Sequence, residues 1–178
     1  MKTKQSILLI SLCSTLLWGM ARAADEAKAK PEENGKETIY VEYRENFTER
    51  APRPYNAMFD ELDRFYYFSH NFKKAFEKQG WPVNFKFERF PIKAPEGAKV
   101  LEMTFLNLRS PSHIELELTM WAKLDDGTQK HDFGVIKVEH VPAPFATSSS
   151  IERDLEVLYT KVAENVIKDL NATIFSPQ

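Results

Sequence analysis

Four histidines carry the most versatile chemistry in this sequence: His70, His113, His131 and His140. Imidazole can bind a metal ion or transfer a proton near neutral pH. A metal site needs ligands at short characteristic spacings, whereas these histidines are scattered over one predicted helix and two predicted strands. No Gly-x-Ser-x-Gly, His-Glu-x-x-His or cysteine signature supplies a nucleophile that Asp132 and a neighbouring histidine could activate. The sequence therefore predicts no metal, no cofactor and no catalytic residue.

Two carboxylates, Glu115 and Glu117, are the next candidates because they lie two residues apart on a predicted strand and point the same way. A close pair of carboxyl groups can act as acid and base in hydrolysis. On the solvated face of an antiparallel sheet, the same residues normally form ion pairs with neighbouring strands. Lys86 and Lys123 are predicted to share that face. We therefore expect a surface charge network, with Glu117 in water.

The candidate binding residues are two aromatic side chains, Trp121 and Tyr67. Both are predicted on the polar faces of their elements, where a large ring has no core to fill. Exposed aromatic residues are enriched at protein interfaces and often anchor a partner. Alternatively, each ring covers neighbouring aliphatic side chains or is itself covered by a terminal segment. Both interpretations stay open at this point.

The strand that positions Trp121 is predicted from His113 to Leu124. Its apolar residues occupy every second position, namely Ile114, Leu116, Leu118, Met120, Ala122 and Leu124. This period of two predicts one buried face and one solvated face.

Four more strands are predicted from alternating or apolar runs: 38–43, 83–88, 100–108 and 133–141. Asp125-Asp126-Gly127-Thr128 has the composition of a hairpin turn between the last two strands. The strands from Val83 onward are therefore expected to form an antiparallel meander.

Two long helices are predicted, each with a wide apolar stripe. The first begins at Asn56 as N-cap and ends at Gly80. The second begins at a capping box formed by Ser149 and Glu152. The order β-α-β-β-β-β-α predicts an α+β fold, a two-layer sandwich with a mostly antiparallel five-stranded sheet and both helices on one face.

Residues 1–23 have the features of a signal peptide: Lys2 and Lys4, an apolar run from Ile7 to Trp18, and the cleavage pattern Ala21-Arg22-Ala23. The apolar run is shorter than the ~20 residues of a membrane-spanning helix. We expect the mature protein to begin at Ala24 in the periplasm or outside the cell, without a membrane span. Residues 24–37 form a charged, flexible leader, and residues 38–175 form a single domain.

Removal of the signal peptide takes away Lys2, Lys4, Arg22 and the only cysteine, Cys13, which leaves a net charge of (24 − 3) − 26 = −5. A mildly acidic surface argues against nucleic acid and anionic membranes as partners. Without cysteine, stability must come from an ordinary apolar core.

In element order, residues 38–175 resemble the small envelope modules of the auxiliary lipoproteins of ABC transport systems and of the lipopolysaccharide-assembly lipoprotein. The chain departs from them at Cys13, because Leu12 precedes it where a lipoprotein has a small residue. Up to Val141 the order is also similar to the cystatin fold, but the inhibitor loop Gln-Val-Val-Ala-Gly is missing. The resemblance implies an accessory module of the cell envelope.

The function expected from these features is that of an exported, non-catalytic binding or accessory module of the cell envelope, with another envelope or secreted protein as its partner. The alternative is a carrier that holds a small hydrophobic ligand in a pocket between the first helix and the sheet. An enzyme without a recognisable motif is the third possibility.

Overall fold

The computed structural model describes residues 35–48, 55, 60–112, 114–145 and 147–175, all within the compact unit Glu32–Gln178. The predicted signal peptide and residues 24–34 of the leader lie outside this part of the chain. The element order is β1 (Glu37–Glu45), α2 (Glu61–Glu77), β2 (Val83–Arg89), β3 (Lys99–Ser112), β4 (Glu115–Asp125), β5 (Lys130–His140) and α3 (Ser148–Thr173).

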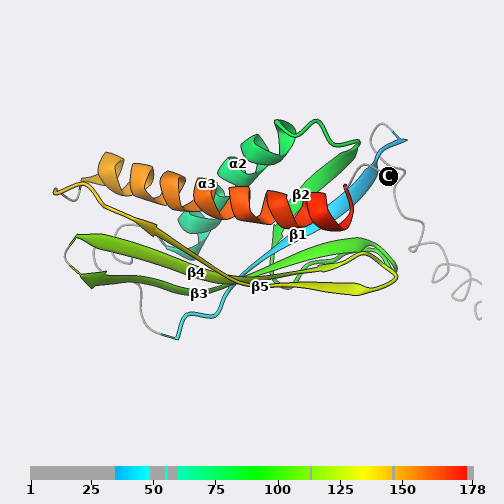
Figure 1. Cartoon of the computed structure of the whole chain (residues 1–178), viewed down its shortest axis with the longest axis horizontal. Helices are drawn as coiled ribbons and strands as arrows, with labels where there is room; N and C mark the ends of the chain where they lie inside the picture. Colours follow the sequence, from blue (N-terminus) through cyan, green and yellow to red (C-terminus); the bar gives the residue numbers. More distant parts are fainter. Residues whose placement is uncertain (1–34, 49–54, 56–59, 113, 146, 176–178) are drawn as a thin grey trace, which may run out of the picture. The chain divides into compact units, whose positions relative to one another are not determined.

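Both helices lie on the same side of the five-stranded sheet (Figure 1). This confirms the predicted fold class and element order. The strand order is β2-β1-β3-β4-β5. β1 runs parallel to both of its neighbours, and the longer β3-β4 and β4-β5 ladders are antiparallel.

The predicted meander is correct from β3 to β5 and wrong for β2. β1 lies between β2 and β3, so β2 and β3 do not pair although they are consecutive in the sequence. Parallel neighbours need long connections. Helix α2 provides the first, and residues 90–98 return the chain from the end of β2 to the start of β3. In this second connection the Phe90 ring lies 3.5 Å from the Arg44 guanidinium carbon, and the Ile92 backbone bonds to Glu42.

The core lies between the helices and the sheet. From β4 it receives Leu116, Leu118, Met120, Ala122 and Leu124, each at most 2% exposed, as the period of two predicts. Burial of such a side chain stabilises the fold by ~1.5–3 kcal/mol. Ile114 was expected on the same face but is 69% exposed, because it precedes the first residue of β4.

Aromatic rings of α2 connect this core. Phe68 packs edge-on against Phe105 of β3 with ring centroids 5.5 Å apart, and against Tyr159 of α3 at 6.0 Å. Phe76, at the other end of the helix, lies 4.5 Å from the Phe85 ring of β2. The helix is therefore covered by the sheet on one side and by α3 on the other.

Both predicted helix starts are displaced. Helix α2 has Asp60 as N-cap, whose Oδ1 accepts hydrogen bonds from the Leu62 and Asp63 amides at 2.8 and 3.0 Å. The predicted cap, Asn56, lies outside the described residues. Helix α3 is capped by Thr147 and Ser150 rather than by Ser149 and Glu152. Several adjacent hydroxyl residues can cap this helix, so composition alone does not select among them.

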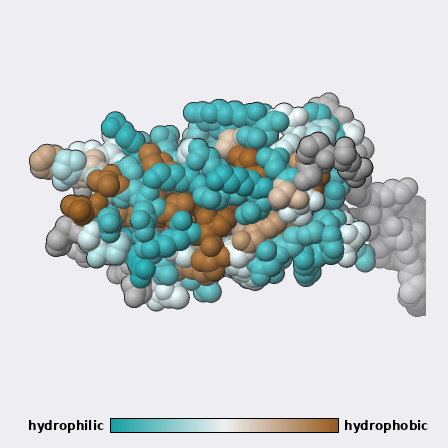
Figure 2. Space-filling model, in the orientation of Figure 1, coloured by the Kyte–Doolittle hydropathy of each residue, from teal (hydrophilic) through white to brown (hydrophobic). Residues whose placement is uncertain are grey.

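Apolar side chains on the visible surface are interspersed with polar ones, and some gather at the end formed by the loop between β5 and α3 (Figure 2). In this loop Val141 is 69% exposed and Phe145 79%. Within the described residues, no helix combines the length and apolarity needed to cross a membrane.

Candidate functional site

His140 makes the most buried polar contact of any described histidine. Its Nε2 lies 2.8 Å from Asp154 Oδ1, and the Tyr55 hydroxyl donates to Asp154 Oδ2 at 2.7 Å. Asp154 is only 3% exposed. Burial, together with this hydrogen bond, raises the pKa of Tyr55. Because the tyrosine donates to the aspartate and not to the imidazole, the trio ties α3 to the end of β5 and lacks the geometry of an activated nucleophile.

Asp132 pairs with neither neighbouring histidine. It accepts a hydrogen bond from the indole Nε1 of Trp121 at 2.7 Å. His131 instead lies 2.9 Å from Asp126 in the β4-β5 turn, and His70 stacks on Tyr66. Among the described residues, no three histidine, cysteine, aspartate or glutamate side chains are close enough to hold a metal ion.

Glu117 was expected in water, and this prediction is wrong. It is 2% exposed although it lies on the sheet face opposite the helices. Its Oε1 accepts from Arg109 Nε at 2.8 Å, and its Oε2 lies 2.8 Å from Lys137 Nζ. Arg109 comes from β3 and Lys137 from β5. The two long cationic side chains cover the carboxylate from both sides, which a count along one strand cannot reveal.

The charge of Glu117 depends on these neighbours. Burial raises the pKa of Glu117, but hydrogen bonds from Lys137 and Arg109 outweigh it and leave the pKa below its ordinary value. The same contact raises the pKa of Lys137. Glu115, the other member of the suggested acid–base pair, is exposed. The two carboxylates therefore differ in environment and form no shared site.

The rest of this face carries the cross-strand ion pairs that the sequence predicts. Lys123 lies 2.6 Å from Glu102 and extends over the Trp121 ring, with Nζ 5.1 Å from the ring centroid. Glu42, under residues 90–98, is paired with Arg44 at 3.2 Å. Burial raises the pKa of Glu42. The charges are thus largely neutralised within the sheet.

A row that is uncharged except at its β1 end crosses this face between the charged rows. Thr104, Trp121 and Val135 are directly opposite one another on β3, β4 and β5. Arg44 on β1 continues the row and carries the Phe90 ring. We call these five residues the tryptophan row. Val135 is 63% exposed and Phe90 51%, while the indole of Trp121 is half-buried and oriented by Asp132.

Tyr67 was expected away from the core, but its ring packs against it. It lies half-buried beside α3, where burial and a hydrogen bond to Glu152 raise the pKa of Tyr67 to about 12. Its neighbour Tyr66 is 62% exposed. Of the two predicted binding residues, Trp121 is on an uncovered face and Tyr67 is engaged by the second helix.

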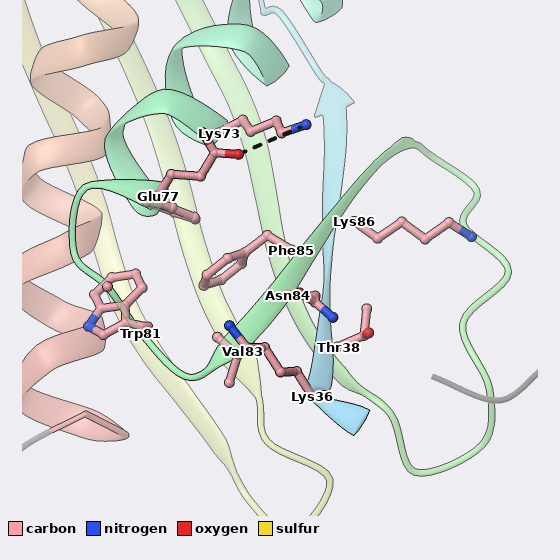
Figure 3. Close-up of a pocket in the computed structure, with 11 residues that line it drawn as sticks. Lys36, Thr38, Lys73, Glu77, Trp81, Val83, Asn84, Phe85 and Lys86 are labelled. Carbon is pink, nitrogen blue, oxygen red and sulfur yellow. Dashed lines mark ion pairs between the residues drawn. The ribbon is translucent and has the colours of Figure 1, made fainter. Parts of the chain in front are cut away.

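A hollow of about 650 Å³ lies between the C-terminal turns of α2 and the edge strand β2, where the sequence suggested a ligand pocket. Figure 3 shows the Phe85 ring on the helix side of β2, with Lys73 and Glu77 above it, whereas Lys86 extends away on the other side. The lining of the hollow is part aromatic and part cationic. It consists of Lys36, Thr38, Lys73, Phe76, Glu77, Gly80, Trp81, Val83, Asn84, Phe85 and Lys86.

A buried ion pair lies in the core beside this helix. Arg64 binds both oxygens of Glu45, with Nε–Oε1 2.7 Å and Nη2–Oε2 2.8 Å. The Tyr43 hydroxyl donates to the same carboxylate, and burial raises the pKa of the fully buried Tyr159 beside it. No sequence pattern predicts this cluster, because its members come from β1, α2 and α3.

No protein-family model and no curated protein sequence matches this chain. Among solved structures, an uncharacterized protein is 7% identical, covering 75% of this chain and 92% of its own, with a TM-score of 0.51. A hypothetical protein from Chlamydia trachomatis is 8% identical, covering 80% of this chain and 99% of its own, with a TM-score of 0.50. A minor lipoprotein from Acinetobacter baumannii is 13% identical over 76% and 93%, with a TM-score of 0.42. The first two similarities show the fold alone.

Proposed function

We propose that this chain is an exported, non-catalytic binding module of the cell envelope that docks onto a partner protein through the tryptophan row. The observation that carries the proposal is the register of Thr104, Trp121 and Val135, which places an uncharged strip across three strands. Export is supported by the signal-peptide features of residues 1–23.

The composition of the row is that of an interface centre. Aromatic residues and arginine are enriched at such centres, while lysine and glutamate are depleted there and found at the rim. Here Trp121, Phe90 and Arg44 supply the rings and the guanidinium. The indole of Trp121 is oriented by its hydrogen bond to Asp132, which reduces the entropy lost on docking.

The surrounding charges favour a specific partner over a nonspecific one. Glu102 is already paired with Lys123, and Glu117 with Arg109 and Lys137. A partner gains little binding free energy from pairing with side chains that are already neutralised in this way. A partner that places a charge of the same sign next to one of these side chains is disfavoured. We infer that the row supplies affinity and that its charged borders set register.

We include the absence of catalysis in this proposal. Three of the acid–base groups singled out by the sequence are held in structural contacts: His140 binds Asp154, His131 binds Asp126, and Asp132 binds Trp121. A catalytic group needs a reacting partner within hydrogen-bond reach. An enzymatic turnover that depended on one of these side chains would contradict the proposal.

Site-specific photocrosslinking in intact cells tests the docking surface. A photoreactive phenylalanine at Val135 should give one reproducible adduct, and the same residue at Val141 should not. Val141 is the matched control, a valine of similar exposure (69% against 63%) outside the row. When Trp121→Ala is added to the protein that carries the photoreactive residue at position 135, the adduct should disappear. Truncation of an interface anchor typically costs ~2 kcal/mol or more of binding free energy.

The proposal fails if positions 135 and 141 give the same adducts, if neither gives any, or if Trp121→Ala leaves the Val135 adduct unchanged. An adduct with twice the mass of this chain identifies a second copy as the partner and overturns docking to another envelope protein. Circular dichroism of each variant establishes that it is folded.

A second candidate function, a carrier of a small ligand, is favoured by the hollow beside α2. This site is on the helix side of the sheet, at the opposite edge from β5. The two proposals therefore use different surfaces, and each can fail without the other.

A further inference from the structure

The hollow between α2 and β2 has the size of a small-molecule site. Its volume of about 650 Å³ is within the ~300–1,000 Å³ typical of ligand pockets. Elsewhere along α2 the helix-to-sheet space is filled, as the complete burial of Phe68 and Phe72 shows. The hollow opens where the last turn of the helix reaches the short edge strand.

One wall of the hollow is aromatic and fixed in place. Trp81 stacks on Phe175 with ring centroids 4.3 Å apart and an interplanar angle of 15°. Its indole Nε1 donates to Asn171 Oδ1 at 3.1 Å. Phe85 contacts both Trp81 and the buried Phe76, at 5.7 and 4.5 Å. These rings need little reorganisation to receive a ligand.

The same wall leaves apolar surface accessible. Trp81, Val83 and Phe85 are each only half-buried, although all three pack against the core. Covering such surface removes it from water and is favourable by roughly 25 cal/mol per Å². The apolar part of a ligand would lie against these three side chains.

The rim of the hollow is cationic. Lys73 is paired with Glu77 at 4.0 Å while both side chains are 66% exposed, and an ion pair of this kind contributes little. Lys36 forms no ion pair with another residue in the described ranges. Lys86 is held by Glu88 at 2.7 Å and points to the other side of the strand (Figure 3). Lys36 and Lys73 are therefore the two ammonium groups available to an anion.

We propose that this hollow binds a small amphipathic anion. Its ring-bearing or short-chain apolar body packs on Trp81, Val83 and Phe85, and its single carboxylate, sulfonate or phosphate group pairs with Lys36 or with Lys73, which lie at opposite ends of the hollow (Figure 3). The purely hydrophobic ligand expected from the sequence does not match this rim. The proposal is independent of docking through the tryptophan row.

A structural role of the lysines makes a different prediction. Solvent-exposed lysines such as Lys36 and Lys73 can serve solubility alone, and that role requires no ligand. The two accounts separate in a binding measurement with a matched pair of probes. 8-Anilinonaphthalene-1-sulfonate carries the anionic group, and N-phenyl-1-naphthylamine has the same aromatic body without it.

The exported protein should bind the sulfonate probe at one saturable site and the uncharged probe several-fold more weakly. The double variant Lys36→Gln, Lys73→Gln should bind the sulfonate at least about tenfold more weakly, a loss of ~1.4 kcal/mol, with little change for the uncharged probe. Lys93→Gln with Lys168→Gln is the control pair, since both lysines are exposed outside the hollow.

The NMR chemical shifts of the indole N–H groups show where the probe binds, independently of its affinity. The sulfonate should shift the Trp81 signal and leave the Trp121 signal in place. Val83→Glu should also prevent binding, because it puts a carboxylate against the aromatic wall. Equal affinity for both probes, equal effects of the two lysine pairs, the absence of a saturable site, or a shift confined to Trp121 would each overturn the proposal.

Discussion

The Glu117 carboxylate lies 2.8 Å from the Lys137 ammonium group, with the glutamate side chain 3% exposed and the lysine side chain 50% exposed. Among the described residues, no helix covers this face of the sheet (Figure 1). The burial of the anion is therefore produced by the side chains that neutralise it. This arrangement separates Glu117 from the ordinary surface carboxylates of the same strand.

Glu117→Gln should destabilise the protein near neutral pH by ~1–3 kcal/mol, the cost of weakening charge-assisted hydrogen bonds to a buried group. The pKa of Glu117 in the folded state lies below its ordinary value of 4.5. The stabilisation is therefore present above the unfolded pKa and is lost as the pH falls through the lower, folded pKa. Urea titrations of the two proteins should converge in acid.

Glu115→Gln is the control on the same strand, because Glu115 is exposed. It should change stability by no more than ~0.5 kcal/mol at any pH. Equal effects of the two substitutions, or a Glu117→Gln effect that grows in acid, would contradict the role given to Arg109 and Lys137.

Two apolar residues of the predicted alternation, Leu118 inside β4 and Ile114 just before it, provide a second test. Leu118→Ala should cost ~2–5 kcal/mol, since the side chain is 2% exposed and its loss leaves a cavity. Ile114→Ala, at 69% exposure, should change stability by ~0.5 kcal/mol or less. Chemical unfolding measures both. Comparable losses would mean that β4 extends further toward the turn.

The Arg64–Glu45 pair should be sensitive to the shape of the cation. Arg64→Met removes one partner of a buried ion pair and should destabilise the protein by ~3–5 kcal/mol. Arg64→Lys should rescue only part of this loss, because an ammonium group cannot occupy both carboxylate oxygens as the guanidinium does. Thermal unfolding compares the three proteins, and full rescue by lysine would show that charge alone matters.

Export gives the fourth prediction. Edman sequencing of the protein recovered from the envelope or the medium should begin at Ala24, after the Ala21-Arg22-Ala23 pattern. Ala23→Tyr is the control variant, because it removes a small residue that the cleavage pattern requires. Recovery of an intact chain beginning at Met1, or lipid on Cys13, would show that the segment has another role.

The alternation of apolar and polar residues was sufficient to predict which side chains of a strand face the core. The alternation along β4 predicted the burial of Leu116 and Leu118 because both lie on the face turned toward the helices. It also placed Trp121 on the opposite face. It gave the wrong environment for Glu117, since that burial depends on Arg109 and Lys137 from two other strands.

The candidate sites were predictable to different extents. A pocket between the first helix and the sheet was expected, but its cationic rim was not, because Lys36 and Lys73 come from segments that meet only after β1 and α2 are positioned. Val135 was also missed as part of the surface. Only the pairing of Trp121 with Val135 across β4 and β5 shows that they form one row.

The position of β1 affects the time course of folding. Its hydrogen-bonding partners are β2 and β3, and the Glu37–Val83 and Ile39–Lys99 register pairs span much of the domain sequence. The first strand to be synthesised thus stays unpaired until later segments are available, and pairings of this range fold slowly. If the chain is exported in extended form, as the proposed function requires, late closure of β1 lengthens the interval in which the precursor stays competent for translocation.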